Sequence, residues 1–436
     1  MIIRDDIMKN KILLYYSTAK LRWKILNKKA ITPEHTEFIE SHKSLSNCKA
    51  YFADMHIHIG RDHNNKPVKI TGAKKLTLTN ILIEASRNKG IDLIGVIDCH
   101  VPSVQDEIRQ LITDQVAVEL PDGGIRFENV TLLLGSEIEL YDENCKGPIH
   151  VLCFFPFLSE ITSFTEWLSE RMKNVNLSSQ RYYGTAKELQ YKVKELSGIF
   201  IPAHIFTPFK SLYGKGVGKT LEEVFDPDLI DAVELGLSSD SVMANGIEEL
   251  GKYTFLSNSD AHSLPKIARE YQEVFMEEPS FKEFTWALHQ IDNRGISKNF
   301  GMNPKLGKYY NTVCKACLSP MTKSQEQCTN CGSTKKINGV KERIVELTTD
   351  QIMPTRPPYI HQVPLEYLPS LGPKTFTKLL EKFDTEMNII HHVSIEQLKT
   401  IIPENLASAI IDNRNGILPI KPGGGGKYGS IIKGKD

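Results

Sequence analysis

The sequence predicts an α/β protein with a metal site along one edge of a largely parallel sheet. From Tyr51 to about Asn299, short apolar strands alternate with helical stretches, a pattern typical of parallel sheets whose strands are joined by helices. Polar residues stand at the strand ends. In parallel α/β folds the loops of an active site converge on that edge, so these polar residues are the first candidates for function.

The elements are expected in a regular series along the chain. A helical stretch over residues 12–26 precedes the sheet and has no recognisable chemistry. A helix over residues 78–89 is expected to end at Gly90, since glycine accepts the left-handed conformation that closes many helices. After the first strand, which begins near Tyr51, strands are expected at residues 91–97, 130–134, 149–155, 199–203, 232–235 and 253–257.

The first strand carries Asp54, His56 and His58. Successive side chains of a strand point to opposite faces, so these three share one face and the apolar residues between them share the other. Two imidazoles at i and i+2 present nitrogens to one point, as a divalent transition metal requires. An isolated His-x-His arises often by chance, so the interpretation depends on what later strands add.

Later strand ends add many more potential ligands. A single histidine at a strand end is more often structural than a ligand. Burying one polar side chain without compensation costs roughly 2 kcal/mol or more, so a large set on one sheet is hard to explain as core. Cys99 alternates away from its neighbour His100 and is expected in the core. The set contains seven of the thirteen histidines and four carboxylates: His56, His58, His63, His100, His150, His204, His262, Asp54, Asp98, Glu137 and Asp260.

The order of these motifs resembles that of the polymerase and histidinol phosphatase (PHP) superfamily: His-x-His, Asp-x-His, Gly-x-Glu, a histidine opening a strand, a lone histidine and a final Asp-x-His. The resemblance implies a distorted seven-stranded (βα) barrel that binds three metals for phosphoester hydrolysis. It assigns one metal to His56, His58, Glu137 and Asp260, a second to Glu137, His150 and His204, and a third to His63, His100 and His262.

Two or three divalent ions (Zn²⁺, Mn²⁺, Fe²⁺ or Mg²⁺) are therefore expected in the barrel, and the mixed imidazole and carboxylate ligands suit the first three better than Mg²⁺ or Ca²⁺. Two metals bridged by Glu137 would lower the pKa of a water and aim it at phosphorus. His56, His58, Glu137 and Asp260 are thus the expected catalytic set. Asp54 and Asp98 are expected to orient ligand imidazoles.

Loops around this edge combine aromatic and basic residues, which proteins use to stack unpaired bases and hold their phosphates. The same aromatics could instead anchor the loops on the barrel. By position, the serine pair is expected to line a base pocket, and Tyr182, Tyr183 or Phe209 to fill a gap in stacked DNA. The candidate contacts in these loops are Arg61, Tyr182, Tyr183, Phe209, Ser238 and Ser239.

Beyond the barrel, Cys314, Cys317, Cys328 and Cys331 form two Cys-x2-Cys pairs. This spacing predicts one structural Zn²⁺ held by four thiolates, with no open position for catalysis. From Lys305 to Arg343, eight basic residues stand against two acidic ones, although the whole chain balances at 53 of each sign. The module is therefore expected to rest against phosphates.

The C-terminal region is expected to be helical. The segment from Leu368 to Leu380 resembles the helix-hairpin-helix module, in which a glycine turn and the next helix's amides hold a DNA phosphate. Gly372 and Lys374 are the candidate contacts. An ordinary helical hairpin is the alternative. Residues 395–411 look like a second copy without the glycine, and the tail from Lys421 to Gly429 is glycine-rich.

The order of these modules resembles that of the endonuclease Q family, from residue 51 to the C-terminus. Ala53–Arg61 and Gly95–His100 carry the resemblance most clearly. It implies cleavage of DNA on the 5′ side of deaminated bases (uracil, hypoxanthine, xanthine) or abasic sites. The expected domains are an extension of unassigned role (1–49), a PHP domain (50–300), a zinc module (301–350) and a helix-hairpin-helix-like DNA-binding domain (351–436).

Two alternatives remain open on sequence alone. A PHP-type phosphatase for small molecules, such as histidinol phosphate, would leave the C-terminal modules without a task. A DNA-binding protein with a decayed site would not need every motif position filled. No apolar run reaches the roughly 20 residues of a membrane span, no signal peptide is recognisable, and cysteine usage indicates a reducing cytoplasm. We expect a cytoplasmic monomer that binds damaged DNA, with a sliding clamp or repair protein as a possible partner.

Overall fold

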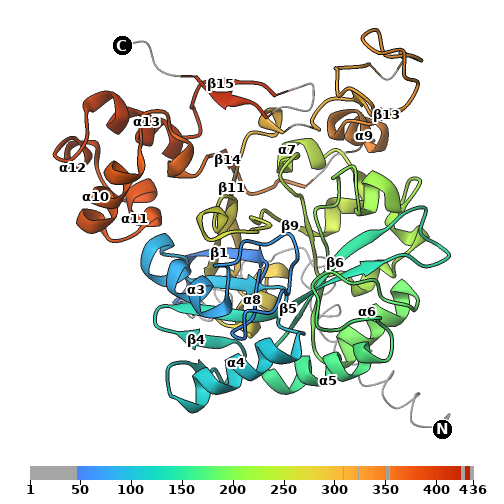
Figure 1. The fold of residues 1–436 in the computed structure, drawn as a ribbon, viewed down its shortest axis with the longest axis horizontal. Coiled ribbons are helices and arrows are strands. Elements are labelled where there is room, and N and C mark those ends of the chain that lie inside the picture. Colours follow the sequence, from blue (N-terminus) through green and yellow to red (C-terminus); the bar gives the residue numbers. More distant parts are fainter. Residues whose placement is uncertain are drawn as a thin grey trace, which may run out of the picture. The chain divides into compact units, whose positions relative to one another are not determined.

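The strand with the His-x-His motif lies inside a mixed sheet in the computed structural model, which describes residues 47–307, 309–322, 324–349, 351, 354–423 and 428–432. From Cys48 onward the described residues belong to one compact unit. β1 (Lys49–Ile57) pairs in parallel with β2 (Leu93–Val96), and β2 pairs in parallel with β5 (Val130–Leu140) (Figure 1). The helix expected at residues 12–26 lies outside the described residues.

The sheet is mixed rather than largely parallel, which corrects the sequence prediction. β6 (Ile149–Phe155) pairs antiparallel with β5, and β7 (Ile199–Pro202) pairs antiparallel with β6. The loop of residues 141–148 is too short for the crossover of roughly a dozen residues that a parallel return needs. Because β6 runs backwards, the histidine that opens it lies opposite Glu139, near the carboxyl end of β5.

A separate parallel pair, β8 (Ala232–Glu234) and β9 (Thr254–Leu256), continues the ring beyond β7. A few backbone hydrogen bonds connect it on both sides. Toward β7, the Asp231 amide donates to the Phe200 carbonyl at 3.1 Å. Toward β1, the Ala261 amide donates to the His56 carbonyl and the His58 amide donates to the Ala261 carbonyl, both at 3.0 Å. The paired ladders of the described residues do not close a continuous barrel. The α/β class is confirmed, whereas a count of seven barrel strands stays a prediction.

Further strands extend the sheet on both sides and were missed by the sequence pattern. On the β1 side, β10 (Tyr271–Met276) pairs antiparallel with β1, β11 (Gly295–Gly301) follows it, and β14 (Tyr359–His361) joins β11 in parallel. β3 (Val118–Glu119) and β4 (Ile125–Phe127) lie beyond β5. Because β14 follows the cysteine module in sequence, the C-terminal region shares a sheet with the barrel.

Apolar side chains fill the space enclosed by the strands. Met55, Leu133 and Phe154 belong to one fully buried cluster. A Cβ atom on Gly95 or Gly135 would lie 2.7 Å from the Phe154 ring, closer than packed atoms allow. Glycine at these two positions of β2 and β5 therefore leaves room for the ring, and the strand ends beyond it come close to one another.

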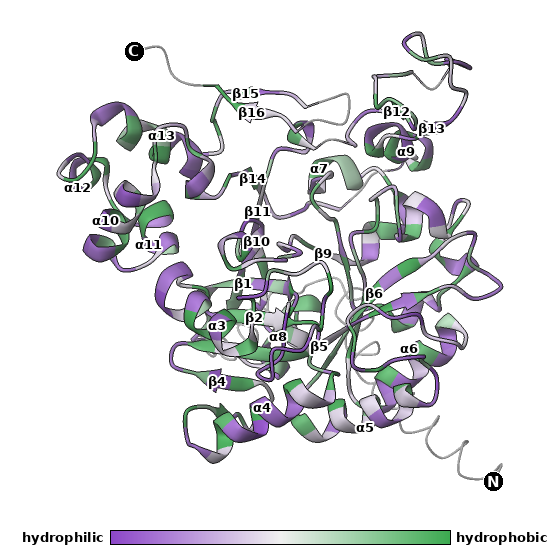
Figure 2. Ribbon diagram, in the orientation of Figure 1, coloured by the Kyte–Doolittle hydropathy of each residue, from purple (hydrophilic) through white to green (hydrophobic). Residues whose placement is uncertain are grey.

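Helices cover the strands with amphipathic faces (Figure 2). The helix predicted at residues 78–89 is present as α3 (Leu78–Ile83) and a continuing turn of Glu84–Lys89, and Gly90 closes it at φ 74°. Four of the next five helices bury apolar side chains on one side, and the short helix at residues 241–244 is the exception. These helices are α4 (Pro102–Thr113), α5 (Leu158–Ser169), α6 (Ala186–Glu195), α7 (Ser241–Ala244) and α8 (Phe281–Leu288).

The C-terminal elements pack against this core. The cysteine module contains β12 (Val313–Cys314), β13 (Lys336–Ile337) and α9 (Val340–Leu347), and a small ladder joins β15 (Ile420–Lys421) to β16 (Ser430–Ile431). A buried ion pair, Lys89 Nζ to Glu386 Oε2 at 2.5 Å, links the C-terminal helical region to the turn of Glu84–Lys89 that continues α3. The helical region comprises α10 (Pro373–Phe383), α11 (Glu386–His391), α12 (Ile395–Lys399) and α13 (Glu404–Arg414).

Among the described residues, no helix combines the length and the apolar character needed to cross a membrane.

Candidate metal centre

Four side chains from three places in the sequence meet where β1, β5 and β9 end. The distances between their ligand atoms are 3.6 Å from His56 Nε2 to Glu137 Oε1, 3.5 Å from His56 Nε2 to Asp260 Oδ1, and 3.4 Å from His58 Nε2 to Asp260 Oδ1. Four donors about 2.1 Å from a metal at the centre of a tetrahedron are about 3.4 Å apart. The group thus has the spacing of a metal site.

The hydrogen bonding of the two histidines supports the same conclusion. Nε2 of His56 and Nε2 of His58 are buried and have no hydrogen-bond partner, which is costly for a polar atom. Both nitrogens face the carboxylates of Glu137 and Asp260. A cation at this point would satisfy all of them, so the residues present fit a divalent metal.

A second group adjoins the first through Glu137. His150 Nδ1 lies 2.7 Å and His204 Nε2 lies 3.5 Å from Glu137 Oε1. The ligand atoms of these three residues all lie within 4.8 Å of one another. Glu137 therefore lies between the two groups, with Oε1 facing this pair and Oε2 3.7 Å from His58 Nε2, and its bridging role stays a prediction.

Carboxylates behind the imidazoles fix their orientation. Asp98 Oδ2 accepts from His58 Nδ1 at 3.2 Å, as the sequence predicts. Glu234 Oε2 accepts from His56 Nδ1 at 2.9 Å and was not among the predicted residues. Such partners hold the ring and leave Nε2 to the metal. Glu234 ends β8, so the same strand-end pattern that identified the ligands could have included it.

Asp54 has a different role from the one predicted. Its carboxylate accepts from the backbone amides of Ser259 at 3.0 Å and Ala268 at 2.9 Å, not from an imidazole. Asp54 thus holds the loop that follows β9 and carries Asp260. The position of Asp260 at φ 46° in that loop is one that few residues other than Gly, Asn and Asp adopt.

Charges in the group are strongly interdependent. Burial works against a charged His56, but Glu234 and Asp260 outweigh it and raise its pKa to about 10. Burial likewise opposes ionisation of Asp260, but His56 and His58 hold the pKa of its carboxyl far below the usual range. The Asp260 carboxylate is therefore ionised at neutral pH. A divalent cation would displace protons from the imidazoles when it binds.

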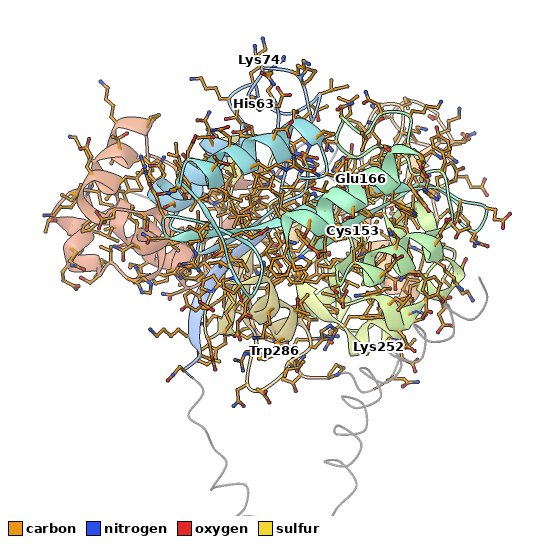
Figure 3. The ribbon with its side chains drawn as sticks, turned by 90° about the horizontal axis from the view of Figure 1, so that it is seen from below. His63, Lys74, Cys153, Glu166, Lys252 and Trp286 are labelled. Carbon is orange, nitrogen blue, oxygen red and sulfur yellow. The ribbon has the colours of Figure 1, made fainter. Side chains whose placement is uncertain are left out.

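The third predicted metal set does not assemble among the described residues. His63 is 41% exposed at the margin of the molecule (Figure 3), and its Nε2 lies 2.8 Å from the Asn64 side-chain amide. His100 has Ser136 Oγ at 2.9 Å from Nδ1 and the Leu177 carbonyl at 3.4 Å from Nε2, so both nitrogens are engaged. Of this set, His262 alone lies against the first group, with its ring 4.5 Å from that of His58.

A cavity of about 960 Å³ opens directly over the metal-ligand groups. Its floor contains the ligands, and basic side chains, including Lys69 and Arg269, lie around them. The opposite wall is largely apolar and comes from the C-terminal half of the chain, with Leu306, Val363 and Ile431 among its residues. Sequence patterns gave no sign that the segment near Ile431 would line a cavity over the barrel.

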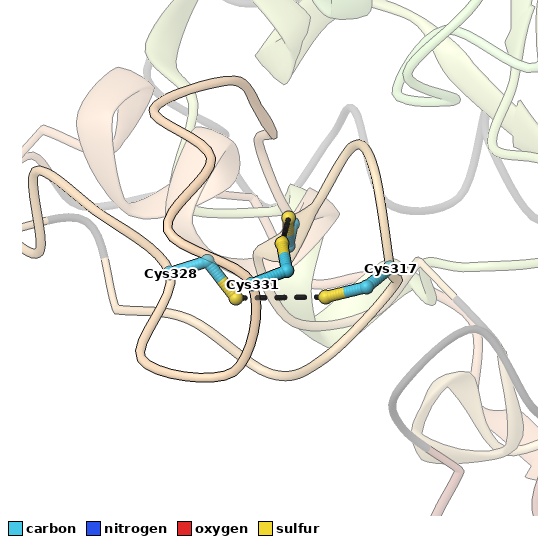
Figure 4. Close-up of side chains that lie close together, drawn as sticks. Cys317, Cys328 and Cys331 are labelled. Carbon is cyan, nitrogen blue, oxygen red and sulfur yellow. Dashed lines mark hydrogen bonds between the residues drawn. The ribbon is translucent and has the colours of Figure 1, made fainter.

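The four cysteines form a separate site. Cys314 Sγ lies 3.6 Å from Cys331 Sγ, and Cys317 Sγ lies 3.5 Å from Cys328 Sγ (Figure 4). Four sulfurs about 2.3 Å from a tetrahedral Zn²⁺ are about 3.8 Å apart, so the spacing fits zinc. Hydrogen bonds from Ser319 and Asn330 lower the pKa of Cys317 to about 5, which makes its sulfur a thiolate at neutral pH.

Comparison with known proteins agrees with this geometry. The chain is 52% identical over 384 residues to the uncharacterised protein YqxK of Bacillus subtilis, covering 88% of this chain and 99% of that protein. It superposes with a TM-score of 0.76 on the lesion-specific endonuclease PfuEndoQ from Pyrococcus furiosus, at 31% identity over 88% of this chain and 95% of the other. The chain belongs to the endonuclease Q family.

Two further comparisons extend this result. An endonuclease Q complex with a 27-mer duplex bearing an abasic lesion at the active site matches with a TM-score of 0.76, at 30% identity over 89% of this chain and 97% of that one. The protein MJ0043 of Methanocaldococcus jannaschii is 36% identical over 255 residues, which cover 52% of this chain and 31% of that protein. No protein-family model matches the sequence.

The predicted DNA contacts of this endonuclease Q family member differ in their exposure and in the cavities that they line. Phe209 and Ser238 line the cavity over the metal groups, and Phe209 is 47% exposed. Tyr183 is 49% exposed and lines a separate surface hollow. Arg61 donates to the Asn65 carbonyl at 2.7 Å. These four remain candidates for contact with a nucleic acid.

Two of the predicted contacts are placed differently. Tyr182 is 1% exposed and stacks on Trp167 at 5.3 Å, so it is part of the core and has no reach toward DNA. Ser239 is also buried, and its hydroxyl donates to the Leu235 carbonyl at 2.8 Å. Adjacent residues of an extended segment point to opposite sides, which explains why one tyrosine is exposed and the other is not.

The predicted helix-hairpin-helix contacts lie at the start of α10. Gly372 caps the helix, and a Cβ atom there would meet nothing within 4 Å. Lys374 follows on the exposed first turn. The preceding element of this segment is a single turn, Leu365–Tyr367, rather than a full helix. The predicted resemblance to the helix-hairpin-helix module therefore stays a prediction.

Proposed function

We propose that this chain is a DNA repair endonuclease that hydrolyses the phosphodiester on the 5′ side of a deaminated base or an abasic site. The observation that carries the proposal is the pair of ligand groups that adjoin each other at Glu137 and line a cavity. Its volume of about 960 Å³ falls at the upper end of the roughly 300–1,000 Å³ typical of ligand pockets, which leaves room for one extruded nucleotide.

The residues have separate tasks in this mechanism. Divalent metals, for which Zn²⁺, Mn²⁺, Fe²⁺ and Mg²⁺ are the candidates, would activate a water and neutralise phosphate charge when bound. Glu137 holds the two groups at a fixed separation, while Glu234 and Asp98 keep Nε2 of His56 and His58 directed at the site. None of these residues has to act as an acid or base.

Lesion selectivity would come from the cost of removing a nucleotide from the duplex. Extrusion costs a few kcal/mol and least where the base is damaged or missing. Phe209, which meets the Tyr309 ring edge-on at 5.5 Å, is the aromatic candidate for contact with the displaced base or the gap it leaves. Ser238, in the same cavity, is the candidate for a polar contact to the base.

The zinc module and the helices would bind the flanking duplex without reading its sequence. Phosphate contacts of this kind position a protein and supply most of its non-specific affinity. A solved relative in complex with a duplex that carries an abasic lesion supports this part of the proposal. A sliding clamp as partner and a monomeric state remain part of the proposal.

One assay tests the function directly. Labelled duplexes that are undamaged or that carry uracil, hypoxanthine, xanthine or an abasic site are incubated with the protein and Mn²⁺ or Mg²⁺. We expect cleavage of damaged strands only, 5′ to the lesion. Equal cleavage of undamaged DNA would contradict the lesion specificity, and hydrolysis of histidinol phosphate alone would favour the small-molecule phosphatase.

A further inference from the structure

A lysine stands beside the first ligand group, in the lining of the cavity. Lys69 Nζ lies 3.4 Å from Glu137 Oε2 and donates to Ser179 Oγ at 2.6 Å. Its side chain is 16% exposed and lines the cavity over the metal groups. The ammonium therefore lies beside the first group and faces the space that a substrate would enter.

The chain holds this lysine firmly. Its backbone amide donates to the Ile59 carbonyl at 2.8 Å, and its carbonyl accepts from the Gly72 amide at 2.9 Å. The Ser178 amide donates to the carbonyl of the preceding Val68 at 3.0 Å. Two segments thus converge on the site, one carrying Lys69 and the other carrying Ser179, whose hydroxyl also donates to Glu137.

His262, the remaining residue of the third set, lines the same cavity as Lys69. His63 and His100 are engaged elsewhere, as described above. Lys69 and the His262 ring, which lies 4.5 Å from the His58 ring, therefore both stand beside the first group, without the third ligand set that the PHP pattern assigns.

We propose that Lys69 supplies the third positive charge of the site by binding an oxygen of the scissile phosphodiester. The proposal rests on the function proposed above. A divalent metal held by Glu137 would compete with Lys69 for the negative charge of that carboxylate. The ammonium then needs another anion, and the substrate phosphate provides one. This role requires no proton transfer.

The first test is the metal content of the purified protein. We expect two ions in the barrel and one Zn²⁺ in the cysteine module, measured by elemental analysis against protein concentration. A Cys317→Ser variant separates the two contributions. Three barrel ions per chain would overturn the proposal, because the third cation would then be a metal.

The second test measures phosphate binding directly. Inorganic phosphate is titrated calorimetrically into the metal-loaded protein and into metal-loaded Lys69→Met and Lys69→Arg variants. We expect Lys69→Met to weaken binding at least tenfold and Lys69→Arg to restore most of it. Lys210→Met is the matched control, since Lys210 lines the same cavity but pairs with Glu139 at 2.8 Å. Its phosphate affinity should change less than threefold.

Cleavage kinetics complete the test. Removing one charged donor from a transition state typically costs 10²–10³ in rate, so Lys69→Met should lower the single-turnover rate about 100-fold with barrel metal content unchanged. Unchanged phosphate affinity, or loss of barrel metal from Lys69→Met, would overturn the proposal. Phosphate binding and metal content do not depend on DNA being the substrate, so a failed endonuclease assay leaves this result distinguishable.

Discussion

The barrel centre and the cysteine module bind metal in opposite ways. The barrel ligands come from strand ends spread between His56 and Asp260, whereas the four cysteines lie within Cys314–Cys331. The barrel groups have buried imidazole nitrogens without partners and a cavity above them. The cysteine sulfurs instead face one another. A site assembled by the whole fold is open for chemistry, while a site assembled by one loop completes its own coordination.

The largest effect should come from removing one barrel ligand. Asp260→Asn keeps a residue that tolerates the φ of 46° at this position but removes the negative charge shared by His56 and His58. We expect at least a 10³-fold loss of lesion cleavage, measured under single-turnover conditions, with little change in the affinity for an abasic duplex. A fall in melting temperature that matches the loss of activity would instead make Asp260 a structural residue.

A smaller effect should follow from a change one step further from the metal. Glu234→Gln retains an oxygen near His56 Nδ1 but removes the carboxylate that accepts from it at 2.9 Å. Such changes typically cost 10–100-fold in metal affinity or activity. Titrating activity against Mn²⁺ concentration measures this. Glu139→Gln is the comparison, because the Glu139 carboxylate lies 3.6 Å from His150 Nε2 at the rim of the second group. An equal loss of metal affinity or activity in Glu139→Gln would show that distance from the first group does not matter.

The sequence revealed the barrel ligands well because their positions follow from one rule, the strand end. It failed where loops decide. His63 was assigned by approximate spacing, but Asp62 Oδ1 accepts from the Asn64 and Lys66 amides at 3.0 and 2.8 Å and closes a tight turn that directs the histidine outward. The segments that carry Lys69 and Ser179 have no periodic pattern, and only the folded chain brings them to Glu137.

The sequence pattern did not show the direction of the strands either. Apolar runs identify strands but do not state which way they run, and the mixed sheet follows from the short loop before β6. The ligand assignment of His150 was unaffected, because a histidine that opens an antiparallel strand lies at the same edge as one that follows a parallel strand. The cysteine site could be predicted without strand directions, since the spacing of its cysteines is local in the sequence.

A third prediction separates exposed from buried aromatic residues of the loops. Phe209→Ala removes a ring that lines the cavity, and stacking on a base is worth about 1–3 kcal/mol. We expect roughly a tenfold weaker binding of an abasic duplex by fluorescence anisotropy. Tyr182→Phe, in the core against Trp167, should leave binding unchanged. A larger effect from Tyr182→Phe than from Phe209→Ala would reverse the present placement of the DNA contact.

The smallest effect should come from the cysteine module, and it tests the comparison itself. Cys317→Ser should release zinc and weaken duplex binding several-fold, because the basic residues around the module would lose their fixed arrangement. The barrel should keep its metals, since Arg343 of α9 is anchored independently to the barrel carbonyls of Tyr213 at 2.8 Å and Gly218 at 2.7 Å.

Elemental analysis and anisotropy at two salt concentrations measure these two outcomes, with Cys48→Ser, a cysteine outside the module, as the control. A weaker salt dependence of binding in Cys317→Ser would place phosphate contacts on the module, because each lost contact reduces the slope of log affinity against log salt by about 0.9. Unchanged affinity and slope would argue against a DNA-binding role. Loss of barrel metals together with zinc would show that the two sites depend on each other, and the contrast between an open site built by the fold and a closed site built by one loop would fail.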